Sequence, residues 1–567
     1  MKCGIFLLST IMLLGTVITA KGVGAMPEKD NASKLEYWVE DALVKVLPNV
    51  KPPIVATKEV VINAARDEFE SAQIIVKANT DIENLSVKPS RFNGNGNSTV
   101  CPRISVDFVS TVPVKIGTKD TPREDLLTTS PADIPDPISE ARFVSVSSGV
   151  NQTIWITVHV TPRTLPGTYT CSVRISADGH NVYVPVTLNV YAARVSPTRS
   201  LFVTNWFSTD NIAKAHNVEK WSEPFWKKLM SWAKVMADHR QNTVITPIFE
   251  LITAKKDSDG NMTFDFSKFD RWVKLFFDAK FTTIEGGHFG GRSEWEAPDF
   301  NATHMTTTLP DGSLEPDPGV KVSSEAERVF LSKFLPAYQA HLEKKGWLKH
   351  YYQHLCDEPI TVNAESYNKL SSYVKEYAPK FKIIDASMCK EIVGHIDTWV
   401  PQPQEVDGNP AFFKERVKAG DEVWIYTCLA PKGKYMNRFI DYPLLKTRLL
   451  HWMNFKYGFT GYLHWGLNYW QGDPFTLLEP DWGGGTTLPP GDSHILYPGK
   501  RNPSSSIRFE AMRDGIEDYE LLKQLAQKNP EKANSICNSI VRSMTDYTLD
   551  PKQFRAARLE LLNACSK

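Results

Sequence analysis

Residues 351–359 read Tyr-Tyr-Gln-His-Leu-Cys-Asp-Glu-Pro, an apolar and aromatic run that ends in two adjacent carboxylates and a proline. The run has the composition of a buried β-strand. Its proline cannot extend a strand ladder, because it carries no backbone N–H. Segments on both sides follow the same plan, a strand-like run whose last residues are polar. This repetition decides the fold that we predict for the second half of the chain.

From residue 201 onward, strand-like runs alternate with stretches of helical periodicity. The expected strands lie near residues 201–208, 243–249, 283–289, 350–357, 382–388, 394–400, 422–429 and 459–466. The expected helices lie near residues 221–239, 267–280, 325–346, 362–378, 409–419 and 441–457. Eight strands alternating with helices predict a (β/α)8 TIM-like barrel. An open doubly wound sheet is the alternative, but no Gly-rich nucleotide-binding turn follows the first strand.

Residues 54–195 instead show the alternation of two that is typical of half-buried strands. Residues 169–175 and 182–190 alternate in this way, and the Asp178-Gly179 pair between them indicates a hairpin turn. We therefore predict an N-terminal β-sandwich. Residues 122–137 are rich in proline and poorly periodic, which favours a rigid surface loop. The alternative is that this segment reaches the next domain and helps to shape its cleft.

The first residues resemble an export signal, with Lys2 followed by a largely apolar run at residues 5–18 and then small residues. A membrane anchor is the alternative, but the run is shorter than the roughly 20 residues of a spanning helix. We expect an exported protein, periplasmic or extracellular, without a membrane span after cleavage. The expected parts are a signal peptide (1–25), the β-sandwich (26–196), the barrel (197–506) and a C-terminal helical segment packed on the barrel (507–567).

Composition excludes several classes of function. The 65 Lys and Arg residues balance the 65 Asp and Glu residues, so no electrostatic feature points to nucleic acid. Removal of Cys3 with the signal leaves an odd number of irregularly spaced cysteines, which does not predict a disulfide framework. We expect no cofactor and no metal, because His, Cys and Asp residues do not follow metal-ligand spacing. The Gly-x-Ser-x-Gly pattern of esterases does not occur either.

The ends of the expected barrel strands supply the candidate site residues, because active sites of such barrels lie at the C-terminal ends of the strands. Asp357 and Glu358 are the candidate catalytic residues. The candidate substrate-binding residues are Trp206, His288, Trp399, Tyr426, Trp465, Asn468 and Tyr469. An acidic pair among aromatic and amide side chains suits a glycosidase, since aromatic rings stack on the apolar faces of sugars.

Adjacent carboxylates cannot flank a glycosidic bond at the usual separations of about 5–5.5 Å or 6.5–9.5 Å. The expected seventh strand also ends without an acid that could act as a nucleophile. One mechanism fits such a pair, in which the 2-acetamido oxygen of the substrate attacks the anomeric carbon. Glu358 would then protonate the leaving oxygen and later activate water. Asp357 would accept the acetamido N–H and orient that group.

The combination of Asp357-Glu358-Pro359, Trp465 and residues 508–520 (Arg-Phe-Glu-Ala-Met-Arg-Asp-Gly-Ile-Glu-Asp-Tyr-Glu) resembles glycoside hydrolase family 123. The resemblance implies an exo-acting β-N-acetylgalactosaminidase with a β-sandwich and a barrel, and it places the catalytic pair of the family on Asp357 and Glu358. The expected substrate is a glycan with a terminal β-linked N-acetylhexosamine. Another 2-acetamido sugar, such as β-linked N-acetylglucosamine, and a non-catalytic carbohydrate-binding protein remain open. We expect the charged residues of the run to form a structural set of ion pairs that joins the last helix to the barrel, with contact to the active site as the alternative: Arg508, Glu510, Arg513 and Asp514.

Overall fold

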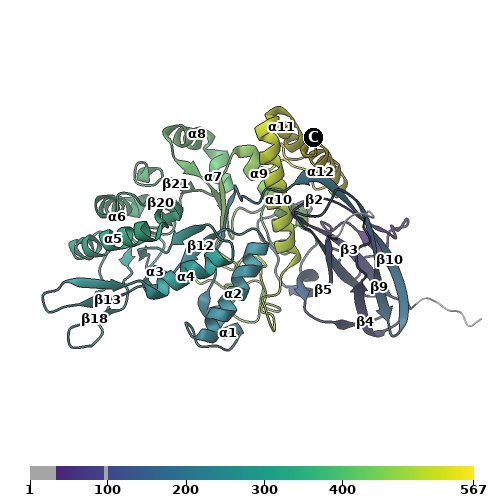
Figure 1. Ribbon diagram of the computed structural model, residues 1–567, viewed down its shortest axis with the longest axis horizontal. Helices are drawn as coiled ribbons and strands as arrows, with labels where there is room; N and C mark the ends of the chain where they lie inside the picture. The colour runs from purple at the N-terminus through teal and green to yellow at the C-terminus, as the bar shows by residue number, and fades with distance from the viewer. Residues whose placement is uncertain (1–33, 95–99) are drawn as a thin grey trace, which may run out of the picture.

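The computed structural model describes residues 34–94 and 100–567. The expected signal peptide, residues 1–25, lies outside the described residues. Figure 1 shows a sheet-rich part formed by the N-terminal third of the chain and a mixed part of helices and strands. Helix α10 (Ile507–Lys528) lies between these two parts.

The N-terminal part consists of two five-stranded sheets. The first has the order β1 (Leu35–Glu40), β3 (Glu68–Ala78), β8 (Asn151–Val160), β5 (Arg103–Val114) and β6 (Ala132–Ser139). The second has the order β2 (Val60–Arg66), β10 (His180–Arg194), β9 (Gly167–Ala177), β4 (Ile82–Pro89) and β7 (Phe143–Val146). Inward side chains of both sheets share one core, for example Ile74 and Ile156 from the first and Val173 and Val186 from the second. This arrangement agrees with the expected β-sandwich.

The interpretation of residues 122–137 as a surface loop holds for residues 122–131 but not for residues 132–137, which belong to strand β6. Strand β6 lies at the edge of its sheet and pairs there with β5, and an edge strand tolerates prolines because one side of it needs no ladder bonds. Asp136 of this strand is fully buried, and its Oδ1 lies 2.8 Å from Nε of Arg508 in α10. The segment therefore reaches the next part of the molecule, as the alternative interpretation had it.

The second part is built on parallel strands. A six-stranded sheet has the order β12 (Thr243–Thr246), β15 (Thr283–Gly286), β19 (Tyr351–Gln353), β20 (Lys382–Ala386), β21 (Thr398–Val400) and β22 (Glu422–Val423). A three-stranded sheet has the order β11 (Phe202–Asn205), β24 (Gly461–His464) and β23 (Ile425–Thr427).

Each of the eight expected strand regions contains an observed strand, but the strands are shorter than expected. Backbone hydrogen bonds also connect the two sheets, from Asn242 N to Val203 O at 3.2 Å and from Trp424 N to Trp399 O at 2.9 Å. Complete closure of the strands into a barrel stays a prediction.

Helices follow the strands in the second part (Figure 1). They are α1 (Thr209–Ala215), α2 (Glu223–Asp238), α3 (Ile248–Leu251), α4 (Ser267–Asp278), α5 (Glu325–Lys345), α6 (Ala364–Tyr377), α7 (Pro403–Gly408), α8 (Pro410–Ala419) and α9 (Leu444–Tyr457). The start of α5 is fixed by Ser324, whose side chain accepts a hydrogen bond from Glu327 N. Its end is fixed by Gly346, which takes the left-handed conformation at φ 72°.

The C-terminal helices α10, α11 (Pro530–Ile540) and α12 (Pro551–Cys565) complete the fold. The charged residues of the run form ion pairs as expected, with Arg513 bonded to Glu510 and Asp514 and with Glu510 bonded to His239 after α2. Arg508, however, pairs with Asp136 of the sandwich and not with the expected barrel. These charges join α10 to the sandwich and brace its own first turns.

Two further observations concern the described residues as a whole. All seven cysteines among them are free. None of their helices combines the length and the apolar character that crossing a membrane requires.

Candidate active site

Two adjoining cavities open at the C-terminal ends of the parallel strands, and Trp206 and Asp357 line both. The first has a volume of about 200 Å³ and is lined further by Glu358, Tyr426 and Trp465. The second has a volume of about 520 Å³; its lining includes His288, Tyr469, Glu250 and Asp210. Both candidate catalytic carboxylates therefore border the smaller, more aromatic cavity.

The backbone after β19 explains how neighbouring residues can serve one cavity. The strand ends at Gln353, earlier than expected, so the in-out alternation of a strand no longer applies at Asp357 and Glu358. Glu358 takes φ 48°, in the left-handed region that non-glycine residues rarely adopt. Arg292 holds this turn, because its Nη2 donates to the carbonyl oxygen of Asp357 at 2.6 Å and to that of Glu358.

Glu358 lies in surroundings that suit a general acid. The Tyr426 hydroxyl donates to Glu358 Oε1, and Gln402 Nε2 donates in turn to the Tyr426 hydroxyl at 2.8 Å. Burial, and next to it the negative charge of Asp357, raise the pKa of Glu358 to about 7. A carboxyl with this pKa still holds its proton in part of the molecules at neutral pH.

The carboxyl of Asp357 has a lower pKa than that of Glu358. Asp357 is exposed at the cleft. Desolvation by the surrounding protein raises its pKa to about 6, and the positive charges of His354 and Arg292 limit this rise. Asp357 therefore loses its proton at a lower pH than Glu358 does. The pair can hold one carboxylate and one carboxylic acid in the same cavity.

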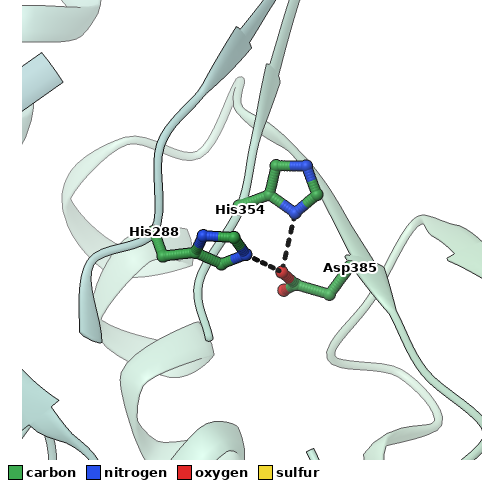
Figure 2. A group of neighbouring side chains, drawn as sticks. All are labelled: His288, His354 and Asp385. Carbon is green, nitrogen blue, oxygen red and sulfur yellow. Dashed lines mark hydrogen bonds and ion pairs between the residues drawn. The ribbon is translucent and has the colours of Figure 1, made fainter. Parts of the chain in front are cut away.

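His354 lies behind the catalytic turn, fully buried. Its Nε2 lies 2.5 Å from Glu285 Oε1, and its Nδ1 lies 2.9 Å from Asp385 Oδ1. Figure 2 shows that His288 also points towards Asp385, with its Nε2 3.8 Å from Oδ1. The three residues were not apparent as a group in the sequence, because they follow or belong to three different strands.

The cluster of His288, His354 and Asp385 could hold a metal by proximity, since the three ligating atoms lie within 4.8 Å of one another. The hydrogen bonds of His354 indicate that its ring binds protons and not a metal. Each ring nitrogen of His354 faces a carboxylate oxygen, so both must carry a proton, and a doubly protonated ring offers no lone pair to a metal. The two carboxylates raise the pKa of His354 to about 10 against the effect of burial.

Five of the seven predicted substrate-binding residues line the cleft. Trp206, Tyr426 and Trp465 border the first cavity, and Trp206, His288 and Tyr469 border the second. Trp465 is positioned by Asp492, whose Oδ2 accepts from the indole Nε1 at 3.2 Å.

The structure does not bring Trp399 and Asn468 to either cavity. Trp399 is fully buried, donates to Asp421, and packs against Phe412 of helix α8. It faces away from the strand side that carries Val400, because successive residues of a strand point to opposite faces. Asn468 is also fully buried, and its side chain accepts from Ser208 N and donates to Ser208 O instead of reaching a cavity.

Several residues of the site were missed in the sequence. Some had a visible signal: His354 belongs to the stretch quoted first, and Glu285 stands beside the Gly-Gly-His end of its strand. Trp482 precedes three glycines that favour a mobile loop, yet it lines the first cavity and packs 4.7 Å from Trp465, centroid to centroid. The others are Arg292, Asp385 and Gln402.

Comparisons with known proteins relate the chain to one family of glycoside hydrolases. The family model described as glycoside hydrolase 123, catalytic domain, matches residues 206–525, and the model of the glycoside hydrolase 123 N-terminal domain matches residues 49–177. No curated protein sequence matches the chain.

Among solved structures, a family 123 glycoside hydrolase from Clostridium perfringens has a TM-score of 0.72 at 18% identity, covering 94% of this chain and 97% of that one. The likeness shows a shared fold. A GH10 xylanase from Thermobacillus composti has a TM-score of 0.30 at 11% identity and covers 56% of this chain and 97% of that one. A β-glucuronidase from Parabacteroides merdae has a TM-score of 0.30 at 9% identity and covers 81% of this chain and 51% of that one.

Proposed function

This chain belongs to glycoside hydrolase family 123, and we propose that it is an exo-acting, retaining β-N-acetylgalactosaminidase that uses substrate-assisted catalysis. The observation that carries the proposal is the placement of Asp357 and Glu358 side by side on one small cavity. Two neighbours on one turn cannot attack a sugar from opposite faces. The nucleophile is then best supplied by the 2-acetamido group of the substrate.

In the proposed reaction, the terminal sugar occupies the first cavity, where Trp206, Trp465 and Trp482 offer aromatic faces. Glu358 protonates the glycosidic oxygen while the acetamido oxygen attacks the anomeric carbon from the opposite face of the ring. The Asp357 carboxylate accepts the acetamido N–H and stabilises the positive charge that develops there. Glu358, now a carboxylate, removes a proton from water, which opens the cyclic intermediate with overall retention.

Two features support the choice of substrate and the surrounding architecture. The Clostridium perfringens relative hydrolyses glycolipid glycans, so we propose terminal β-linked N-acetylgalactosamine of glycolipid or glycoprotein glycans as the substrate. Parallel pairing and the bonds between the two sheets support a (β/α)8 barrel as the scaffold. An exported location would bring the enzyme to such glycans.

The test compares an aryl β-N-acetylgalactosaminide with the matching aryl β-galactoside. We expect turnover of the first to be faster by orders of magnitude, because only that substrate carries the internal nucleophile, and we expect NMR to show the β-anomer of the product first. Equal rates on the two substrates would contradict substrate assistance.

The same assay separates the remaining alternatives. Faster turnover of the aryl β-N-acetylglucosaminide would keep the mechanism and change the sugar. Binding of N-acetylgalactosamine without turnover of any aryl glycoside or of a glycolipid oligosaccharide would identify a carbohydrate-binding protein.

A further inference from the structure

A buried row of three charged groups lies behind the catalytic turn. Glu285 of β15 and Asp385 of β20 are fully buried on the two strands that flank β19, and His354, just after β19, bridges them with contacts of 2.5 and 2.9 Å. Isolated charges are costly to bury, so the opposite charges of such a row must pair with one another. None of its members takes part in the proposed proton transfers.

Additional donors hold both ends of the row as carboxylates. Thr204 Oγ1 donates to Glu285 Oε2 at 2.7 Å, and Trp206 Nε1 donates to Glu285 Oε1 at 3.1 Å. Asp385 Oδ2 accepts from Leu355 N at 3.0 Å and from the Tyr367 hydroxyl at 2.6 Å. Hydrogen bonds donated to a carboxylate favour its charged form, and His354 between the two carboxylates faces one of their oxygens with each ring nitrogen.

We propose that His354, held as an imidazolium between Glu285 and Asp385, is a positioning residue that keeps Asp357 ionised while Glu358 retains the proton. The inference rests on the proposed function, in which the two carboxyls need opposite protonation states. The residue that maintains these opposite protonation states is then His354, which is buried and lies three residues before Asp357 in the chain.

The groups that face Asp357 from each neighbouring segment favour this assignment. The negative charge of Asp385 from β20 opposes ionisation of Asp357, and the charge of Asp357 in turn raises the pKa of Glu358 in the same turn. The cations that favour ionisation of Asp357 are His354 and Arg292. Arg292 is partly exposed to solvent, which screens its charge more than that of His354. The charge of His354 is fully buried and acts through a medium of lower dielectric constant.

Other titratable groups near the row stay neutral. His288, whose ring centroid lies 4.7 Å from that of His354, has its pKa lowered to about 4 by burial and by the charge of His354. Burial also raises the pKa of Tyr469 to about 12 and that of Tyr426 well above its usual range. His354 is thus the buried cation of this group of residues.

The row also touches the sugar-binding surface. Trp206, which lines both cavities, donates to Glu285 and stands edge-on to His354 at a centroid distance of 5.4 Å. A purely structural role of the row would therefore affect KM through Trp206. A role in ionising Asp357 would instead displace the pH dependence of kcat/KM.

The test uses the double variant His354→Gln/Glu285→Gln, which removes one buried cation together with one buried anion and so avoids leaving two unpaired carboxylates. We expect the acidic limb of the pH profile of kcat/KM to move to higher pH by about one unit or more, because Asp357 loses its buried cation. The matched control is Thr204→Val, which deletes a hydrogen bond to Glu285 and leaves every charge in place. Its acidic limb should stay where it is in the wild type.

A measurement that does not need activity separates this inference from the proposed function. Carbon-13 NMR of labelled aspartate carboxyls, with Asp357 assigned through Asp357→Asn, should show Asp357 titrating at higher pH in the double variant than in the wild type. NMR of labelled histidine rings should show His354 doubly protonated at pH 8. Inactivity on every aryl glycoside and on a glycolipid oligosaccharide would remove the proposed function, while these titrations would still decide the role of His354.

Three results would overturn the inference. One is an acidic limb and an Asp357 titration that are the same in the double variant and the wild type. The second is a neutral His354 ring at pH 7. The third is loss of activity in a chelator with recovery on added Zn²⁺, which would mean that His288, His354 and Asp385 hold a metal instead of a proton.

Discussion

At the scale of single residues, Asp357 and Glu358 should respond differently to substitution, because only one of them transfers a proton to the leaving group. Glu358→Gln should lower kcat by about 10²–10⁴-fold for a natural glycan, and much less for an aryl glycoside whose leaving group needs little protonation. Asp357→Asn should lower kcat strongly for both substrates, because orientation of the acetamido group is lost in either case. Steady-state kinetics on the two substrates, with circular dichroism to verify folding, make the comparison. A variant of either residue with near-normal rates on the natural glycan would remove that residue from the mechanism.

The same two carboxyls set the expected pH dependence. Below a pH of about 6 Asp357 is protonated and cannot accept the acetamido N–H, and above about 7 Glu358 has lost the proton that it must donate. We therefore expect a bell-shaped profile of kcat/KM with its maximum between these values. In Asp357→Asn, any remaining activity should lack the acidic limb, because the group that titrates there is absent. A flat profile from pH 5 to 8 would be inconsistent with the assigned protonation states.

The sequence predicted the acidic pair but only part of what surrounds it. Asp357 and Glu358 were recognisable because they follow a strand-like run and precede a proline. The sequence could not show that Tyr426 faces the cleft and Trp399 does not, since both lie in β-type runs. Only the register of each strand decides which side chain faces the cleft. Arg292 acts on backbone carbonyls from a loop, so no spacing in the sequence points to it.

At the scale of secondary structure, the contact between α9 and α10 depends on Gly515. A Cβ added there would lie 2.4 Å from the carbonyl oxygen of Arg448, a backbone atom that cannot move alone. Gly→Ala inside a helix is usually stabilising by up to about 1 kcal/mol. Here we expect Gly515→Ala to reduce the free energy of unfolding by about 1–3 kcal/mol, because the two helices must separate.

Urea unfolding followed by tryptophan fluorescence measures this effect. The control is Gly408→Ala at the end of α7, where an added Cβ meets no atom within 4 Å. A gain in stability for Gly515→Ala would show that the helices can separate at little cost.

The order of the strands and helices was predictable to a large extent, and their ends were not. The alternation of apolar runs between residues 201 and 466 predicted eight strand regions, and each of them contains an observed strand. Burial of the strands imposes this pattern on the sequence. The ends depend on tertiary contacts; at β19, for example, the strand stops at Gln353 while the apolar run continues to Cys356. The prolines around β6 predicted a loop where the structure has a strand, because prolines are compatible with a strand only when it lies at the edge of a sheet.

At the scale of the whole molecule, buried charges join the sandwich to the catalytic part. Arg448 in α9 is fully buried, with its Nη1 2.9 Å from Glu70 of β3 and its Nε 2.8 Å from Asp518 of α10. Arg558 of α12 reaches Glu70 and Asp518 as well. One guanidinium thus contacts carboxylates of both parts at once, which couples their stability.

Acid should weaken this junction in a definite direction. Burial acts to raise the pKa of Glu70, but the charges of Arg448 and Arg555 overcome it and lower the pKa from 4.5 to about 2. A carboxyl with a lowered pKa in the folded state contributes stability above its ordinary pKa, and this contribution is lost as the pH falls from 4.5 towards 2.

Arg448→Met should therefore destabilise the sandwich and the catalytic part together. Glu70 and Asp518 keep Arg558 as a partner but lose their bonds to Arg448, and breaking a buried ion pair costs about 3–5 kcal/mol. Hydrogen exchange measured by mass spectrometry should show faster exchange in both β3 and α10. Lys532→Met serves as the control, because its partner Glu560 is also solvent-exposed and such pairs contribute at most about 1 kcal/mol. Faster exchange confined to α9 and α10, with β3 unchanged, would mean that the two parts are stable independently and that the buried charges only fasten the C-terminal helices.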